Sequence, residues 1–475
     1  MKKMEEKKGA EGVVDGGNSV PDGVSRREFL KRTCLSVAIG GVSGLVLGKV
    51  LFATGIVEDK DDSDVSGSSN ESGVEFAEVK PVPEDERSGK NIMLTSFDGL
   101  DFLRRPFDGW IKSFLEALPD STNVLLLSSV DMDKKYFETI ANKHENVVIN
   151  VVGIEASTMC VMENMLYVQD VFFPSGKIDK NGRFVLFTSA ADFGIMKISQ
   201  DSKGAYSGGG IDPCEALRFV GDDLVVKRYP NYFAGIEAPV SLVGGDVQII
   251  RLPDGRIACL VGKDNLSKTA LYIKGANSLY SNDGGSLDLT KEALMNIKNM
   301  YREALRVDEC IFLDEENIFA NAPLMDYGKL ALFSSFFHSD MIVKTASSPK
   351  DPSEHLAFVT DVKPLSGDES TEAFVWDSEY LDRVEKQFKD LGYRIVSLPC
   401  GPYAALNYTN SVMFTRDGKK YVLLPQYGIH TDNQASDIFE NEGFEVRRVD
   451  MSFILEWMSA VKNAGSLHCM TVVMN

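Results

Sequence analysis

The feature that most constrains the fold of this chain is a repeated alternation of short apolar runs and amphipathic stretches, which begins near Asn91. Short apolar runs rich in β-formers are typical of strands, and apolar residues spaced three and four apart are typical of helices. Strands interleaved with helices predict an α/β or α+β domain. The predicted strands are residues 123–130, 147–152, 183–188, 310–313, 356–359 and 394–398, and the predicted helices are residues 107–118, 134–144, 291–306, 379–391, 435–442 and 451–463.

Two predicted hairpins show that the strands cannot all run parallel. One hairpin covers residues 240–261 around a Pro-Asp-Gly turn, and the other covers residues 412–424 around an Arg-Asp-Gly turn. An Asp-Gly pair flanked by β-forming residues is a typical connection between antiparallel strands. A hairpin followed by a helix and a further strand recurs loosely along the chain, although no exact sequence repeat is present.

The N-terminal segment has the pattern of a twin-arginine export signal. Residues 25–31 read Ser-Arg-Arg-Glu-Phe-Leu-Lys, and an apolar, glycine-rich stretch follows from Cys34 to about Gly55. We therefore expect the twin-arginine translocation machinery to recognise Arg26 and Arg27, and the protein to be extracytoplasmic, in the periplasm or at the cell surface. The segment is expected either to be cleaved or to remain as a membrane anchor. The alternative is a chance arginine pair before a buried helix.

Composition divides the chain into three parts. Residues 56–90 are rich in Asp, Ser, Gly and Glu, so they can bury little apolar surface and are predicted to be a disordered acidic linker. The expected organisation is a signal segment at residues 1–55, this linker, and one folded domain at residues 91–475.

The formal net charge of −20 argues against a nucleic-acid partner, because an acidic surface repels phosphates. It is compatible with a cationic substrate.

The C-terminus contains the most informative stretch, Gly-Ser-Leu-His-Cys-Met-Thr at residues 465–471. Cys469 follows a predicted helix and a turn of small residues, which is a suitable place for an accessible, reactive thiol. The alternative is a core cysteine on the last strand. His468 would point the other way on that strand and is interpreted as structural. The seven cysteines contain no C-x-x-C pair, and their spacing suggests neither a zinc site nor a disulfide framework.

Three acidic positions and one histidine complete the candidate site. His338 and Asp340 are two residues apart, so in a strand they would face the same way and could form a general acid/base pair. The alternative is a surface pair. Asp170 lies within an apolar run, where an acid is either a turn cap or a functional carboxylate. Asp246 follows a Gly-Gly pair at residues 244–245, which permits a tight turn or a close backbone approach.

Taken together and in this order, these pieces resemble the guanidine-modifying (pentein) superfamily. The likeness is strongest to agmatine deiminases and the related bacterial peptidyl-arginine deiminases. It covers the folded region in order and is dense over roughly the last seventy residues. The segments that carry it are Leu-Asn-Tyr at residues 406–408, Val-Leu-Leu-Pro-Gln-Tyr-Gly at 422–428, residues 446–450, and Leu-His-Cys-Met-Thr at 467–471. The resemblance implies a five-bladed α/β propeller of ββαβ-type units around a central site.

The resemblance also implies a chemistry. A guanidinium ion is planar and always charged near neutral pH, and two carboxylates can hold it by paired hydrogen bonds. By resemblance Asp170 and Asp340 would bind the guanidinium, Cys469 would attack its carbon, and His338 would act as general acid and then base. Asp246 is a further candidate for substrate binding. The expected substrate is a small guanidino compound or an arginyl peptide (agmatine, arginine or peptidyl-arginine), and no metal or organic cofactor is required.

Three positions depart from the family pattern. Val243 replaces the acid expected before the Gly-Gly pair, Gln169 replaces the arginine expected before the early aspartate, and the glycine run before the final cysteine is reduced to Asn-Ala-Gly at residues 463–465. These departures leave open a non-catalytic guanidinium-binding or surface protein on the same fold. An amidinotransferase, in which an amine replaces water, is a further alternative. The sequence gives no indication of the oligomeric state.

Overall fold

The computed structural model describes residues 79–95, 104–129, 147–154, 173–189, 226, 229–274, 290–320, 338–361, 378–401, 406–454 and 466–475. The predicted export signal, the predicted helix at residues 134–144 and most of that at 451–463 lie outside the described residues, as does most of the predicted linker. Within the described ranges, no helix is both long enough and apolar enough to cross a membrane.

Four sheets of the described chain share one topology: an antiparallel hairpin followed by a third strand that runs parallel to its second strand. These sheets are β4 (Phe173–Ile178), β5 (Phe184–Ser189) and β6 (Phe233–Ala238); β7 (Val247–Arg251), β8 (Ile257–Val261) and β9 (Glu309–Phe312); β10 (Val343–Ser347), β11 (His355–Asp361) and β12 (Arg394–Pro399); and β13 (Val412–Arg416), β14 (Lys419–Gln426) and β15 (Glu445–Asp450).

Helices make the crossovers that the parallel strand pairs require. Between β8 and β9 lie α8 (Lys263–Lys274) and α9 (Lys291–Leu305), and the short α10 (Glu315–Ala320) follows β9. The crossover from β11 to β12 contains α12 (Ser378–Asp390), and that from β14 to β15 contains α13 (Thr431–Glu442). The structure is therefore an α/β fold of several small mixed sheets.

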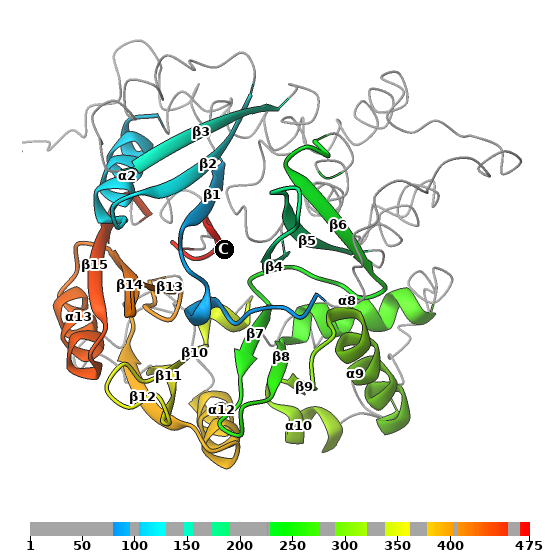
Figure 1. Cartoon of the computed structure of the whole chain (residues 1–475). Helices are drawn as coiled ribbons and strands as arrows, with labels where there is room; N and C mark the ends of the chain where they lie inside the picture. Colours follow the sequence, from blue (N-terminus) through cyan, green and yellow to red (C-terminus); the bar gives the residue numbers. More distant parts are fainter. Residues whose placement is uncertain are drawn as a thin grey trace, which may run out of the picture. The chain divides into compact units, whose positions relative to one another are not determined.

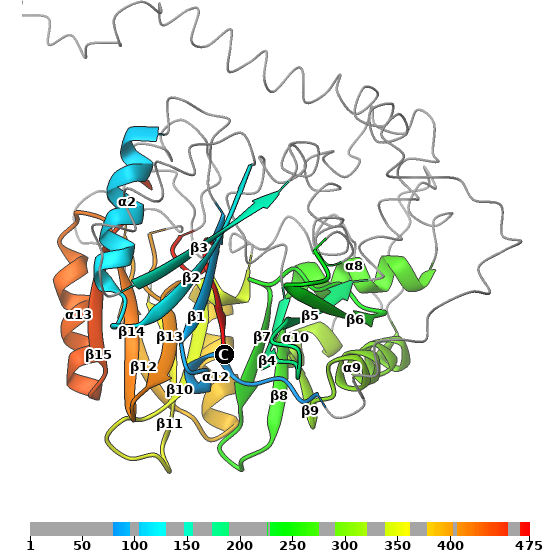
Figure 2. The same cartoon turned by 45° about the horizontal axis from the view of Figure 1, so that its top comes forward.

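A further sheet joins the two ends of the described chain. In it β1 (Asn91–Thr95) runs parallel to β2 (Thr122–Ser129), with α2 (Arg104–Ala117) between them, and β2 runs parallel to β3 (Val147–Ile154). The last strand, β16 (Val472–Met474), pairs antiparallel with β1, so the C-terminus lies beside β1 in Figures 1 and 2. Because β16 begins three residues after Cys469, this pairing holds the segment that carries the thiol.

Each sheet contacts the next one along the chain, and the last contacts the first. The contacting pairs are β16 with β4, α9 with β6, β7 with β10, α13 with β12, and α2 with β15. The cyan helix α2 and the orange strand β15, far apart in sequence, lie side by side in both views (Figures 1 and 2). Buried apolar side chains fill the spaces between these elements, and one large cluster contains Trp110, Phe358 and Phe414.

Helix α9 illustrates how well the local sequence signals work. The Thr290 side chain accepts a hydrogen bond from the backbone N–H of Ala293, and the helix ends at Arg306 in the left-handed conformation with φ 56°. Its buried face is made by Leu294, Ile297, Tyr301 and Leu305, the spacing expected of an amphipathic helix. The helix predicted at residues 291–306 and its apolar spacing are confirmed here.

The predicted end of the linker at residue 90 is wrong. Residues 84–86 form a 3-10 helix, η2, that contacts β10 and β13. The Arg87 guanidinium is buried and donates to the carbonyl oxygens of three separate chain segments. We call residues 79–90 the N-terminal arm. Its charged composition predicted disorder, but those charges pair with basic side chains that lie far away in sequence.

Candidate active site

The thiol of Cys469 lies in a turn at residues 467–470 that leads into β16, and not on a strand as one interpretation had it. The residue is 2% exposed, and its surroundings are polar. The Asn410 side-chain amide donates from Nδ2 to Cys469 Sγ at 3.1 Å. Asn410 Oδ1 accepts from the backbone N–H of His468 at 3.0 Å. One amide side chain therefore fixes both the turn and the sulfur.

His338 and Asp340 do share one site, although the strand predicted for them is wrong. Ser339–Met341 is a 3-10 helix with His338 as its N-cap residue, and β10 begins only at Val343. The backbone N–H of Asp340 donates to the carbonyl of Gly245 at 3.1 Å. An imidazole nitrogen of His338, a carboxylate oxygen of Asp340 and the sulfur of Cys469 all lie within 4.8 Å of one another.

The two carboxylate oxygens of Asp340 have different surroundings. Oδ2 accepts from Asn410 Nδ2 at 2.9 Å and is hydrogen-bonded to His468 Nδ1 at 2.7 Å. The Cys469 thiol lies 3.5 Å from the same oxygen. Oδ1 is buried and has no hydrogen-bond partner among the described residues. A buried acceptor of this kind costs about 1–3 kcal/mol, so a free oxygen at this place is suited to a ligand N–H.

His468 is a site residue whose position the sequence did not predict. Its ring lies between two acids, with Nδ1 bonded to Asp340 and Nε2 to Glu84. Burial lowers the pKa of His468, but the charge of Glu84 and the hydrogen bonds to both carboxylates outweigh burial, and the net pKa is raised. The expectation that His468 points away from the site is wrong, because a turn does not alternate its side chains as a strand does.

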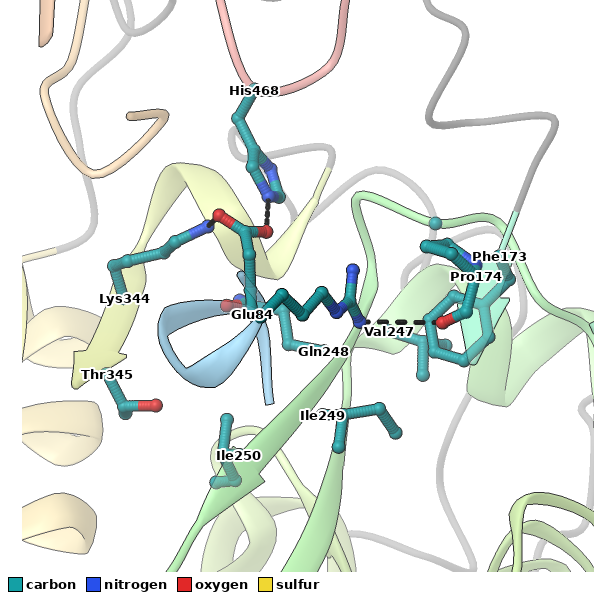
Figure 3. A pocket seen from close by; sticks show the side chains of 12 residues that line it. Glu84, Phe173, Pro174, Val247, Gln248, Ile249, Ile250, Lys344, Thr345 and His468 are labelled. Carbon is teal, nitrogen blue, oxygen red and sulfur yellow. Dashed lines mark hydrogen bonds and ion pairs between the residues drawn. The ribbon is translucent and has the colours of Figure 1, made fainter. Parts of the chain in front are cut away.

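Glu84 of the N-terminal arm is the other end of this buried network. Burial would raise the pKa of Glu84, but the positive charges of His468 and Lys344 hold it well below its usual range. Its Oε1 accepts from Lys344 Nζ at 2.8 Å and from the backbone N–H of Met413 at 2.9 Å. Figure 3 shows His468 and Lys344 turned toward the Glu84 carboxylate. These groups border a small cavity of about 30 Å³.

Asp246 lies close to His338 but is held by the protein chain itself. Its Oδ1 accepts from the backbone N–H of Ser339 at 3.2 Å, and its Oδ2 accepts from that of Asn265 at 2.8 Å. Burial raises the pKa of Asp246 to about 7, and the charge of His338 acts in the opposite direction. Substrate binding by Asp246 stays a prediction, and its contacts indicate support of the His338 turn.

Two glycines make room for this arrangement. A Cβ added at Gly245 would lie 2.4 Å from His338 Nδ1, so the backbone there packs directly against the imidazole. A Cβ at Gly262 would lie 1.7 Å from Asp246 Oδ1. Val243, at the position where the family has an acid, is a buried apolar residue. The acid described beside His338 is therefore Asp246.

Three of the segments that carry the family likeness contact one another next to the turn that holds Cys469. The Tyr427 hydroxyl donates to the carbonyl of Asn407 at 2.8 Å and is hydrogen-bonded to Ser466 Oγ at 2.5 Å. Asn407 Oδ1 in turn accepts from the backbone N–H of Asn410 at 3.0 Å. These contacts place residues 406–408, 422–428 and 466–471 together. Asn410 could have been singled out because it follows Leu-Asn-Tyr closely.

Asp170 and Gln169 lie outside the described residues, so Asp170 remains a prediction from the resemblance. The trio of His338, Asp340 and Cys469 comprises donor types that could also bind a zinc ion. In the resembled family the same residue types react without a metal.

No protein-family model and no curated protein sequence matches the chain. Among solved structures, it is similar to the agmatine deiminase of C. jejuni, with 16% identity over 83% of this chain and 95% of that one and a TM-score of 0.46. It is also similar to the agmatine deiminase of Enterococcus faecalis, with 14% identity over 84% and 96% and a TM-score of 0.47.

A third similar structure is the N-terminal domain of an ArgZ variant covalently bound to a reaction intermediate, with 13% identity over 81% of this chain and 97% of that one and a TM-score of 0.35. The chain is similar to agmatine deiminases, as its sequence motifs also indicate.

Proposed function

We propose that this protein is a cysteine-dependent hydrolase that cleaves a C–N bond of a guanidinium group. The observation that carries the proposal is the convergence of Cys469, His338 and Asp340 within 4.8 Å, with one buried oxygen of Asp340 left without a partner among the described residues. A nucleophile, a proton carrier and an anionic acceptor are the groups that such a reaction needs.

Substrate binding is proposed to use the oxygen of Asp340 that has no partner among the described residues. Asp340 Oδ1 accepts an N–H of the planar cation, and Asp170 supplies the second carboxylate by resemblance. Charge-assisted hydrogen bonds of this kind are stronger than neutral ones. The bound cation also favours the thiolate form of Cys469 by simple attraction, and Asn410 donates a hydrogen bond to the sulfur.

In the first half-reaction, the Cys469 thiolate attacks the central guanidinium carbon and forms a C–S bond. Protonated His338 donates its proton to one nitrogen of the tetrahedral adduct, the C–N bond breaks, and ammonia leaves. A cationic S-alkylthiouronium remains on the sulfur, and His338 is now neutral. Asp246 and Gly245 hold the His338 turn in place for both proton transfers.

In the second half-reaction, water attacks the same carbon while neutral His338 takes one of its protons. The C–S bond then breaks, the ureido product leaves and the thiolate is regenerated. A second proton goes to solvent, where ammonia takes it up as ammonium. The net reaction converts a guanidinium ion and water into a ureido compound and ammonium, with neither metal nor organic cofactor.

The five small sheets are proposed to be the blades of a five-bladed α/β propeller around this site. Their contacts run from each sheet to the next and return to the first, which supports this arrangement. The antiparallel pairing of β16 with β1 would then close the ring next to the thiol turn.

Export by the twin-arginine route is proposed from residues 25–31. An extracytoplasmic location favours an external guanidino compound or an arginyl peptide as substrate. Replacing both Arg26 and Arg27 by lysine is expected to keep the full-length chain in the cytoplasm. Unchanged export of that variant would rule out the route.

The test of function is a substrate screen with the full chain. Agmatine, arginine and an arginyl peptide are incubated with the protein, and ammonia and ureido product are measured. Cys469→Ala is expected to abolish both products, whereas Cys400→Ala, which changes a half-buried thiol on a different strand end, leaves them unchanged. Absence of product with every guanidine would favour a binding protein. Transfer of the amidino group to an added amine acceptor, with release of the donor's own amine and without ureido product, would favour an amidinotransferase.

A further inference from the structure

We propose that the N-terminal arm completes the active site, with Glu84 as a positioning residue that acts through His468 to orient the Asp340 carboxylate toward the substrate. This inference rests on the proposed function and deepens it. It gives a role to a segment whose composition resembles a linker.

The arm is anchored on several sheets at once. Asp85 accepts from Lys420 Nζ at 2.8 Å and from the backbone N–H of Ser347 at 3.1 Å. Arg87 donates to the carbonyl of Val473 at 2.9 Å, on the last strand. Glu84, between these anchors and the thiol turn, is partly buried and faces His468 (Figure 3). An anchored carboxylate can transmit a fixed position to the groups that it binds.

A continuous chain of contacts leads from the arm to the substrate carboxylate. Lys344 Nζ donates to Glu84, Glu84 is bonded to one nitrogen of His468, and the other nitrogen is bonded to Asp340 Oδ2. Both ring nitrogens therefore face carboxylate oxygens, and they can both donate only when the ring is protonated. A protonated His468 and Asn410 together occupy Oδ2, which leaves Oδ1 as the oxygen for the substrate.

Glu84 also balances charge. His468 and the bound guanidinium would be two cations on either side of Asp340, and they would repel each other in a buried site. The charged groups that face His468 are Glu84 and Asp340, which attract a proton to it, and Lys344, which opposes protonation. The negative charge of Glu84 thus allows His468 to stay protonated while a cationic substrate binds.

Two substitutions at Glu84 separate positioning from folding. Glu84→Ala removes the partner of His468, so kcat/KM is expected to fall at least tenfold. Glu84→Gln can still accept from Lys344 through its oxygen and can donate from its amide to His468 Nε2, so it is expected to restore most of this loss. With glutamine at position 84, the His468 ring donates to Asp340 while the ring itself is neutral. Loss of the His468 proton then no longer lowers kcat/KM at alkaline pH, so this part of the pH profile is expected to disappear.

The matched control is Glu86→Gln, on the same 3-10 helix. The carboxylate of Glu86 is engaged by the partly exposed guanidinium of Arg251. The pH profile of this variant is expected to match that of the wild type.

The outcomes are distinguishable. Wild-type kcat/KM in folded Glu84→Ala, or a wild-type pH profile in Glu84→Gln, overturns the role of the arm but leaves the hydrolase proposal intact if Cys469→Ala is inactive. If Glu84→Ala does not fold, the pH profile of Glu84→Gln decides alone. If the wild-type protein acts on no guanidine, both proposals fall.

Discussion

Two turns bring histidines to this site, and they hold them in opposite ways. The ring of His468 is locked between the partly buried Glu84 and the fully buried Asp340. The ring of His338 instead packs against the backbone of Gly245, and Asp246, which supports the same turn, accepts hydrogen bonds from the backbone N–H groups of Ser339 and Asn265.

This difference in surroundings suits one histidine to carrying protons and the other to holding its neighbours in place. A histidine that exchanges protons twice in each turnover has to change its charge easily, and His338 is beside an acid whose own pKa is raised to about 7 by burial. A histidine whose two nitrogens are bonded to carboxylates keeps its proton and holds those carboxylates in place. We therefore assign chemistry to His338 and positioning to His468.

The largest expected effect is at His338. His338→Asn removes the proton carrier, so kcat for ammonia release is expected to fall by about 10²–10⁴-fold. The melting temperature should stay close to that of the wild type, since Asp246 and the surrounding turn remain. Near-normal turnover in the folded variant would reverse the assignment of the two histidines.

A smaller loss of activity is expected when a side chain is added at Gly245, whose backbone packs against His338. A Cβ at Gly245 would lie 2.4 Å from Nδ1, so Gly245→Ala has to displace the ring. A misplacement of about 1 Å can cost about 100-fold in rate, and steady-state kinetics measure it. Gly109→Ala in α2 is the control because its Cβ meets no atom within 4 Å. Equal rates in the two variants would show that Gly245 does not position the imidazole.

The locked histidine is expected to affect stability, with a defined pH dependence. The pKa of His468 is raised on folding, so its stabilising contribution is fully present below the unfolded value of 6.5 and is lost as the pH rises through the folded pKa. Breaking a buried ion pair costs about 3–5 kcal/mol. Urea unfolding should therefore show His468→Gln to be less stable than wild type by about 3 kcal/mol at pH 6, and the difference should narrow as the pH rises. A difference that grows with pH would contradict the account.

No effect is expected from metal removal. Incubation with a chelator followed by desalting should leave ammonia release unchanged, because the proposed reaction uses the thiol, imidazole and carboxylate directly. A loss of activity that added zinc restores would show that the trio of His338, Asp340 and Cys469 is a metal site instead.

The sequence predicted the parts of this molecule that depend on local signals. Both hairpins form, although the first strand of one begins at Val247 and not at residue 240. The cap and buried face of α9 also follow from residues close together in sequence. The short strands β1 and β16 were not predicted, because three to five residues carry too little pattern and their pairing joins the two ends of the chain.

Contacts between residues far apart in sequence also limited the prediction of the candidate active site. Cys469, His338 and Asp340 were found because a family pattern places those residue types in that order. Glu84 was missed because it belongs to an acidic run whose partners, Lys344 and His468, lie hundreds of residues away. No local pattern distinguishes a carboxylate that folding buries from one that water surrounds.

The measurement that tests the central claim most directly is a search for the covalent intermediate. The wild-type protein during turnover and the His338→Asn variant are each mixed with agmatine, arginine or an arginyl peptide, quenched in acid and digested, and the peptides are analysed by mass spectrometry. An amidino adduct on the peptide that contains Cys469, absent from Cys469→Ala, is the predicted result. If wild-type protein turns over a guanidine and no adduct forms on Cys469 in either protein, the proposed cysteine mechanism is contradicted.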